Sequence, residues 1–352
     1  MKDTMIVEIY PTEIDSRLMN ECANILKQGG TVAFPTETVY GLGANALDSK
    51  AVKKIFEAKG RPSDNPLIVH VAKTEEILPL VKEIPEKAHR VIEKFWPGPL
   101  TLIFEKSSII PYEISAGLST VAIRMPSHPI AIRLIEESGV PIAAPSANIS
   151  GRPSPTKAEH VIEDLIGKVD AIIAGGACNV GVESTVLDMT GQVPMILRPG
   201  GVTKEMLEEV LGEVVIDPAV ENPNEINGTP KAPGMKYTHY APKAEVIIIQ
   251  GDLNNTVNKI KDIRLSYEAE NKIVGVICTD ETRDKYEEGI VKSMGSRKHP
   301  ETIAANLFKV LREFDDTDVE IILSEAVDNV EIGQAIMNRL KKAAGYRIIE
   351  AE

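Results

Sequence analysis

The sequence has few cysteines and no long apolar run. Only three of the 352 residues are cysteines, and Cys22, Cys178 and Cys278 lie far apart with no C-x-x-C pair. This number and spacing exclude a disulfide framework and a zinc-finger pattern, and they favour a reducing compartment. No stretch approaches the roughly 20 consecutive apolar residues that a membrane span requires. The first 15 residues also lack the apolar core of a signal peptide, so we expect a cytoplasmic protein with no membrane partner.

Positive charge is scarce as well. The chain has 39 Lys and Arg against 52 Asp and Glu, which gives a formal net charge of −13. A nucleic-acid binder normally has a basic excess, because its affinity comes largely from neutralising phosphates. The charge therefore favours a small-molecule enzyme, although a local basic groove inside an acidic protein would remain compatible with RNA binding.

The standard nucleotide-binding loops are missing. No G-x-x-x-x-G-K-[ST] stretch occurs, and "GLGANA" at 41–46 fits G-x-G-x-x-A only in isolation. "PTETVY" separates it from the preceding strand, and the acidic residue expected after a second strand is absent. We therefore interpret these glycines as shaping a turn. No serine lies in G-x-S-x-G and no histidines have H-x-x-x-H spacing, so we expect neither a serine hydrolase nor a dedicated metal site.

Strand-like and helix-like segments alternate over the first two-thirds of the chain. The sequence predicts strands at 100–105 and 119–126, and a helix at 49–59 that Ser49 is placed to cap. Strands and helices interspersed in this way indicate an α/β domain, which we place at 1–216.

The pattern breaks over 217–242, which holds five prolines, three asparagines and no apolar periodicity. We interpret this segment as a linker. Strands and helices then resume, for example in "AEVIIIQ" and "KIVGVICTD". They predict a second, smaller open α/β sheet over 243–352.

A cationic stretch, "KGRPSDNPLIVHVA" at 59–72, opens onto a strand that carries a histidine. Prolines push the residue before them out of the helical region and stiffen the loop that holds Lys59 and Arg61. Two fixed cations beside His70 suit the recognition of phosphate or carboxylate groups. A lone strand histidine is equally compatible with a core position, so both interpretations of His70 stay open.

Four stretches place hydroxyl or amide residues and prolines directly after apolar strands: "AFPTETVYGLG", "VAIRMPSHP", "AAPSANISGRPSPT" and "GVESTVLD". Functional groups of open α/β sheets collect at strand ends. Arg124 lies within the apolar run V-A-I-R, where a charge is costly unless it is paired or faces a ligand. The residues by themselves predict an anion-binding α/β enzyme, with a structural ion pair as the alternative for Arg124.

The motifs taken together resemble those of the YrdC-like threonylcarbamoyl-AMP synthases. They are, in order, "PTETVYGLG", "KGRPSDNPL", "WPGPLTL", "VAIRMP", "PSANISGRPSPT", "GVESTVLD" and "LRPG". "APGMKYTHYAP" and the second α/β unit resemble the longer, two-domain form of that family. The resemblance covers nearly the whole chain. It implies a YrdC-like catalytic domain with a twisted mixed sheet, followed by a smaller Rossmann-like open α/β domain.

The resemblance implies an activity. The family forms L-threonylcarbamoyladenylate from L-threonine, bicarbonate and ATP, and releases pyrophosphate. A separate transferase complex then moves the threonylcarbamoyl group to the adenosine beside the anticodon in tRNAs that read codons beginning with A. Mg²⁺ is expected to accompany the ATP phosphates without an all-protein cage.

The family pattern also implies individual site residues. It places L-threonine against Thr38, His70, Arg124, the Ala144 backbone and Ser184, with Arg124 pairing the threonine carboxylate. It places ATP against Lys59, Arg61, Asn65, Thr120, Ser146, Ser154, Arg198 and Tyr237. Lys59 and Arg61 are the expected catalytic cations. The reaction brings together a triphosphate, a bicarbonate and a carboxylate, which repel one another without fixed positive charge.

The linker motif suggests a lid. "MKYTHY" within it holds two tyrosines, a histidine, a lysine and a methionine, whereas a solvated spacer would be small and polar. We expect the segment to fold over the active site with Tyr237 touching ATP, and so to shield the intermediates from water. Docking of the second domain by the tyrosines is the alternative.

Two other functions compete with this assignment. One is an RNA-binding or ribosome-associated module, against which the acidic charge counts. The other is the related carbamoyl-adenylate-forming domain of hydrogenase maturation proteins. Those proteins carry zinc-finger and acylphosphatase-like regions, and this chain has neither pattern.

Overall fold

A computed structural model describes residues 2–222, 230–233, 240–286 and 289–352 of the chain. Residues 223–229 and 234–239 of the predicted lid, which include Tyr237, lie outside these residues. Among the described residues, no helix is both long and apolar enough to cross a membrane.

The backbone forms two compact units. Unit 1 comprises Met1–Ser150 and Ser154–Lys236, and unit 2 comprises Gly151–Pro153 and Tyr237–Glu352. The domain limits expected from the sequence, 1–216, 217–242 and 243–352, remain a prediction.

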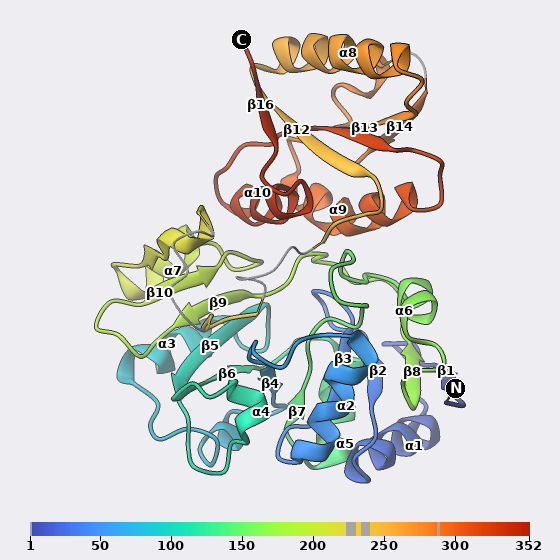
Figure 1. Cartoon of the computed structure of the whole chain (residues 1–352). Helices are drawn as coiled ribbons and strands as arrows, with labels where there is room; N and C mark the ends of the chain where they lie inside the picture. The colour runs from blue at the N-terminus through green and yellow to red at the C-terminus, as the bar shows by residue number, and fades with distance from the viewer. Residues whose placement is uncertain (1, 223–229, 234–239, 287–288) are drawn as a thin grey trace. The chain divides into compact units, whose positions relative to one another are not determined.

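Unit 1 is built on one mixed sheet, in the order β1-β8-β2-β3-β7-β4-β6-β5-β9-β10-β11 (Figure 1). Its strands are β1 (Met5–Glu8), β2 (Val32–Phe34), β3 (Gly41–Asn45), β4 (Ile68–His70), β5 (Leu100–Glu105), β6 (Thr120–Arg124), β7 (Ile142–Ala143), β8 (Ala171–Ala174), β9 (Thr185–Asp188), β10 (Met195–Arg198) and β11 (Val215–Ile216). Its helices are α1 (Ser16–Lys27), α2 (Ser49–Lys59), α3 (Glu86–Phe95), α4 (Tyr112–Ser115), α5 (Pro129–Ser138), α6 (Ala158–Leu165) and α7 (Lys204–Leu211), with 3₁₀ turns η1 (Thr74–Ile77) and η2 (Pro218–Val220). The predicted mixed-sheet α/β architecture is confirmed.

Alternation of side chains along each strand divides the core of unit 1 between the two faces of the sheet. In β2, Val32 and Phe34 pack into one cluster, and Ala33 packs into the other. Helices α1 and α5 supply apolar side chains to the first cluster, and α2 and α3 supply them to the second. Because both faces are covered, the sheet is a rigid support for the loops that join its strands.

Helix α2 spans the predicted range, but its ends differ from the prediction in two respects. Asp48, and not Ser49, is the N-cap, and its carboxylate accepts hydrogen bonds from two N–H groups of the first turn. Gly60 ends the helix in the left-handed conformation, with φ of 59°. Lys59 is therefore the last residue of the helix and does not belong to the loop that carries Arg61.

The segment "GLGANA", predicted as a turn, is a strand instead. Strand β3 pairs antiparallel with β2, so that Gly43 lies opposite Val32 and Gly41 lies opposite Phe34. A Cβ at Gly43 would lie 2.8 Å from the Phe34 ring, too close for any side chain. The prediction was wrong because packing against Phe34, and not a turn, requires glycine at this position.

Unit 2 contains a parallel five-stranded sheet in the order β14-β13-β15-β12-β16. Its elements are β12 (Glu245–Gly251), α8 (Leu253–Ala269), β13 (Val274–Cys278), η4 (Arg283–Lys285), β14 (Ile290–Ser293), α9 (Pro300–Phe314), β15 (Ile321–Glu325), α10 (Ile332–Ala343) and β16 (Ile348–Ala351). Helix α8 covers one face, and α9 and α10 lie together on the other (Figure 1). This is the predicted open Rossmann-like arrangement.

Candidate active site

Sheet pairing in unit 1 brings four of the five residues expected at the L-threonine site into one connected cluster. His70 lies opposite Arg124 in the parallel β4–β6 pair, and Thr101 lies opposite Arg124 in the antiparallel β5–β6 pair. Thr101 hydrogen-bonds the Ser184 hydroxyl at 2.8 Å, and Arg124 donates to the Thr38 hydroxyl at 3.0 Å. Residues far apart in the sequence are thus joined through Arg124 and its strand neighbours.

Arg124 is 4% exposed and is held by three oxygen atoms. Nη2 forms an ion pair with Glu37 Oε1 at 2.7 Å, Nη1 donates to Thr38, and Nε donates to the Gly98 carbonyl at 3.3 Å. A guanidinium has five N–H donors. The other two, one on each terminal nitrogen, form no hydrogen bond within the described part of the chain. Arg124 is therefore fixed in place while keeping donors for a ligand.

Glu37 is the residue that sequence reasoning missed. It lies in the "PTET" loop between β2 and β3, where the Thr36 hydroxyl accepts hydrogen bonds from the Thr38 and Val39 N–H groups and folds the loop tightly. Glu37 is buried, and its Oε2 has no hydrogen-bond partner among the described residues. A buried carboxylate oxygen without a donor is unfavourable unless a ligand or water supplies one. The only local signal was a carboxylate between two threonines after an apolar strand.

His70 is buried beside Arg124 and is neutral. Burial, followed by the Arg124 charge, lowers the pKa of His70 to about 3. Its ring meets Phe34 edge-on at a centroid distance of 6.5 Å, and its Nδ1 has no partner among the described residues. At neutral pH this imidazole serves as a hydrogen-bonding group and not as a cation.

Ser184 is held by Arg198. The Arg198 guanidinium donates to the Ser184 carbonyl at 3.0 and 3.1 Å and to the Ser184 hydroxyl at 3.2 Å. It also donates to the Pro233 carbonyl at 3.3 Å. Arg198, expected to meet ATP, thus also fixes the "GVEST" loop on which Ser184 lies.

Lys59 and Arg61 have different surroundings. Lys59 is 2% exposed, and its ammonium donates to the carbonyls of Ser146 and Asn148 at 2.5 and 2.6 Å. Arg61 donates to the Asn65 and Pro66 carbonyls and lines an open pocket of about 740 Å³ beside α2. Lys59 therefore ties α2 to the "PSAN" loop, and Arg61 lies at the surface of unit 1.

The remaining expected ATP residues are spread over several loops of unit 1. Ser154 donates to Glu183 Oε1 at 2.5 Å, and both side chains are buried. Asn65 is 1% exposed with its Oδ1 unpartnered among the described residues, and Thr120 is buried at the start of β6.

Ala144, the fifth residue expected at the L-threonine site, lies next to the sheet. Its N–H donates to the Ile68 carbonyl, so it extends the sheet beside His70. Within the described residues, no group of three or more His, Cys, Asp or Glu could hold a metal ion.

Comparison with known proteins establishes the family. A family model described as Telomere recombination matches residues 24–200, and one described as Threonylcarbamoyl-AMP synthase, C-terminal domain, matches residues 202–345. Threonylcarbamoyl-AMP synthase of Pyrococcus abyssi is 54% identical over 347 residues, which cover 99% of each chain. The chain belongs to the threonylcarbamoyl-AMP synthase family. The Bacillus subtilis member is 51% identical over 330 residues, which cover 94% of this chain and 93% of its own.

Solved structures agree with this membership. The crystal structure of P. abyssi Sua5 complexed with L-threonine matches with a TM-score of 0.94 and 51% identity, over 99% of this chain and all of that one. The resemblance seen in the motifs is confirmed, and the chain is an enzyme of the threonylcarbamoyl-AMP synthase family, a nucleotidyltransferase.

The buried ion pair of this synthase predicts a non-additive effect on stability. Glu37→Gln and Arg124→Met should each lower the free energy of unfolding by about 3–5 kcal/mol, because each leaves a buried charge without its counter-charge. The loss in the free energy of unfolding should be clearly smaller in the double variant than the sum of the losses in the two single variants. Urea unfolding followed by the fluorescence of Trp96, the single tryptophan of the chain, measures this in unit 1. Lys82→Met is the control, since the Lys82–Glu105 pair is 62% and 54% exposed and should contribute about 0–1 kcal/mol. Additive costs for the two buried positions would contradict the coupling.

The low pKa of His70 predicts a loss of stability in acid. Between pH about 6.5 and about 3, His70 takes up a proton in the unfolded chain and not in the folded one. The contribution of neutral His70 to the stability of the folded state is therefore complete above pH 6.5 and is lost as the pH falls. His70→Asn should flatten the pH dependence of the melting temperature across this range. Exposed His89→Asn is the control and should leave the wild-type profile unchanged. Identical profiles for His70→Asn and wild type would mean that His70 is not buried as a neutral ring.

Proposed function

We propose that the chain forms L-threonylcarbamoyladenylate from L-threonine, bicarbonate and ATP, and releases pyrophosphate. The observation that carries this proposal is the buried Arg124 guanidinium, pinned by Glu37 and Thr38 beside neutral His70. The threonine complex of the P. abyssi relative, 51% identical, supports it.

Arg124 binds the carboxylate of L-threonine through its two remaining N–H donors. A guanidinium with one donor on each terminal nitrogen matches the two oxygens of a carboxylate. Thr38, Ser184 and the Nδ1 of His70 offer hydrogen bonds to the threonine hydroxyl and amine, and Glu37 Oε2 offers an acceptor to the amine. The Ala144 backbone completes the site.

The chemistry joins the amine to bicarbonate and then to AMP. The neutral threonine nitrogen attacks the bicarbonate carbon and a C–O bond breaks. The departing hydroxide takes a proton from the nitrogen and leaves as water, which produces a carbamate. A carbamate oxygen then attacks the α-phosphorus of ATP, and pyrophosphate departs with the electron pair of the broken P–O bond. Negative charge accumulates at each stage, so cations already fixed in position favour the reaction.

Lys59 and Arg61 are the proposed catalytic cations. The Lys59 ammonium is anchored by two carbonyls, so its charge needs no rearrangement when the phosphates arrive. ATP is further bound by Asn65, Thr120, Ser146, Ser154, Arg198 and Tyr237. Mg²⁺ would be held by the ATP phosphates and would neutralise part of their charge. A separate transferase complex carries the threonylcarbamoyl group to tRNAs that read codons beginning with A.

The test is pyrophosphate release from ATP by the purified full chain. Release should require both L-threonine and bicarbonate. L-Valine should fail, because a site built to bond a hydroxyl disfavours the analogue that lacks it. Lys82→Met, an exposed substitution, should retain full activity as a control.

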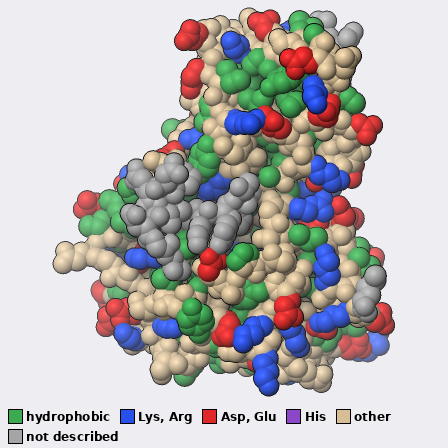
Figure 2. All heavy atoms as spheres, in the orientation of Figure 1, with side chains coloured by type: hydrophobic (Ala, Val, Ile, Leu, Met, Phe, Trp, Pro, Cys, Tyr) green, Lys and Arg blue, Asp and Glu red, His purple; other side chains and the backbone are tan. Residues whose placement is uncertain are grey.

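RNA binding is the outcome that would replace this proposal. On the face shown in Figure 2, Lys and Arg side chains are interspersed with Asp and Glu side chains. Pyrophosphate release that does not depend on threonine would contradict the proposed reaction. Absence of turnover together with strongly salt-dependent RNA binding would favour the RNA-binding module.

A further inference from the structure

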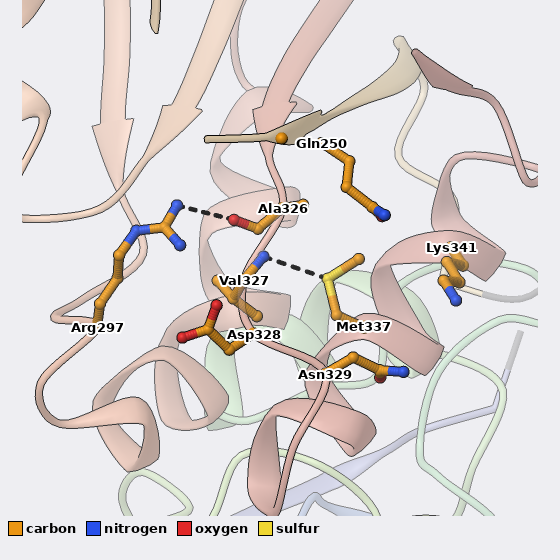
Figure 3. Close-up of a pocket in the computed structure, with 9 residues that line it drawn as sticks. Gln250, Arg297, Ala326, Val327, Asp328, Asn329, Met337 and Lys341 are labelled. Atoms are coloured by element: carbon orange, nitrogen blue, oxygen red, sulfur yellow. Dashed lines mark hydrogen bonds between the residues drawn. The ribbon is translucent and has the colours of Figure 1, made fainter. Parts of the chain in front are cut away.

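Unit 2 has a pocket of about 270 Å³ at the carboxyl ends of β12 and β15 (Figure 3). The two strands are parallel neighbours. The chain leaves β12 towards α8 on one face of the sheet, and leaves β15 towards α10 on the other face. In open α/β sheets, ligands bind in the crevice beyond the carboxyl ends of strands whose connections diverge in this way.

Arg297 forms one wall of this pocket and is fixed by three oxygen atoms. Nη2 donates to Glu325 Oε2 at 3.0 Å and to the Ala326 carbonyl at 2.8 Å, and Nε donates to the Thr279 hydroxyl at 3.1 Å. The two N–H groups of Nη1 form no hydrogen bond within the described residues. Glu325 is fully buried, and its other oxygen accepts the Tyr286 hydroxyl at 2.8 Å.

This environment repeats the one around Arg124 in unit 1. Each arginine is held by one buried glutamate, one threonine hydroxyl and one backbone carbonyl, and each keeps N–H donors that no described residue uses. A buried glutamate–arginine pair gives little net stability. It does, however, orient the guanidinium before a ligand binds, so that binding requires no further reorganisation. The geometry therefore marks Arg297 as a carboxylate-binding residue.

The other side chains of the pocket suit the rest of an amino acid. Asp328 lies on the same side as Arg297, and Lys341 lies across the pocket (Figure 3). The α-ammonium and α-carboxylate of an amino acid share one carbon, so neighbouring Asp328 and Arg297 can bind both. An ammonium has three donors, so Lys341 can serve a ligand in addition to any protein partner. Lys341 and Gln250 can donate hydrogen bonds to an oxygen on the side chain of the amino acid. Met337 offers an apolar surface.

A nucleotide fits this pocket less well. The volume of the pocket lies just below the roughly 300–1,000 Å³ that is usual for the sites of larger ligands. Phosphates in Rossmann-like sheets bind at the N-terminus of the first helix. In α8 that position is taken by Asp252, whose carboxylate accepts hydrogen bonds from the Asn254 and Asn255 N–H groups.

We propose that unit 2 carries a second small-molecule site, which binds an α-amino acid with an oxygen-bearing side chain. Arg297 binds its carboxylate, Asp328 its ammonium, and Lys341 with Gln250 its side-chain oxygen. The site does not depend on the proposed reaction, because none of these residues lies in unit 1.

Hydrogen–deuterium exchange of the full chain tests this site in place. L-Glutamate or L-threonine at millimolar concentration should slow exchange in the peptide that contains Val327–Asn329. L-Leucine, acetate and inorganic phosphate should do so weakly or not at all. Substituting Arg297 would leave the buried Glu325 without a cation, so the variants are Asp328→Asn and Lys341→Met. Each should raise the Kd, read from the dependence of protection on concentration, by about tenfold or more.

Lys309→Met is the matched control, because Lys309 pairs with Glu313 on α9 outside the pocket lining. It should leave the protection unchanged. Three results would overturn the proposal: no protection by either amino acid, equal protection by phosphate, or protection that survives both pocket variants. Pyrophosphate release is measured on the same samples, so failure of this site and failure of the proposed reaction are read separately.

Discussion

Arg124 is 4% exposed and lies at the end of a strand in a covered sheet, so the charge of its guanidinium must be balanced by a group close by. Glu37 provides that balance at 2.7 Å, and the Thr38 hydroxyl and the Gly98 carbonyl accept further hydrogen bonds from the same guanidinium. The loop after β2 must fold tightly on the Thr36 hydroxyl so that Glu37 and Thr38 both reach Arg124. Such a pair contributes little to net stability, but it fixes the cation to which we assign the threonine carboxylate.

Electrostatics in this site are arranged before any ligand arrives. Burial lowers the pKa of His70 and keeps its ring neutral. Of the two paired residues His70 and Arg124, only Arg124 therefore carries a positive charge. Lys59 is anchored on two carbonyls, and Arg198 is anchored on the Ser184 loop. Side chains that are already oriented need no rearrangement when charge develops, which is how fixed dipoles and ions accelerate reactions of anions.

The sequence predicted local features well and distant pairings poorly. Leu100–Glu105 and Ser49–Lys59 appear with the predicted limits, because apolar periodicity is a local signal. Gly41–Asn45 was misjudged, since only the packed Phe34 ring reveals why a strand there contains glycine. A charge within an apolar strand singled out Arg124, and the structure shows it in a buried ion pair. Its partner Glu37 lies 87 residues away, and no sequence pattern connects the two.

The proposed reaction requires that threonine be carboxylated on nitrogen before AMP is transferred, while Arg124 holds the carboxylate of the amino acid. Mass spectrometry of the adenylated product formed from ¹³C-bicarbonate, L-threonine and ATP tests this claim most directly. The proposed reaction predicts threonylcarbamoyl-adenylate with the label in the new carbonyl carbon. An unlabelled threonyl-adenylate would show that the amino-acid carboxylate itself attacks ATP, and it would contradict the assignment of Arg124.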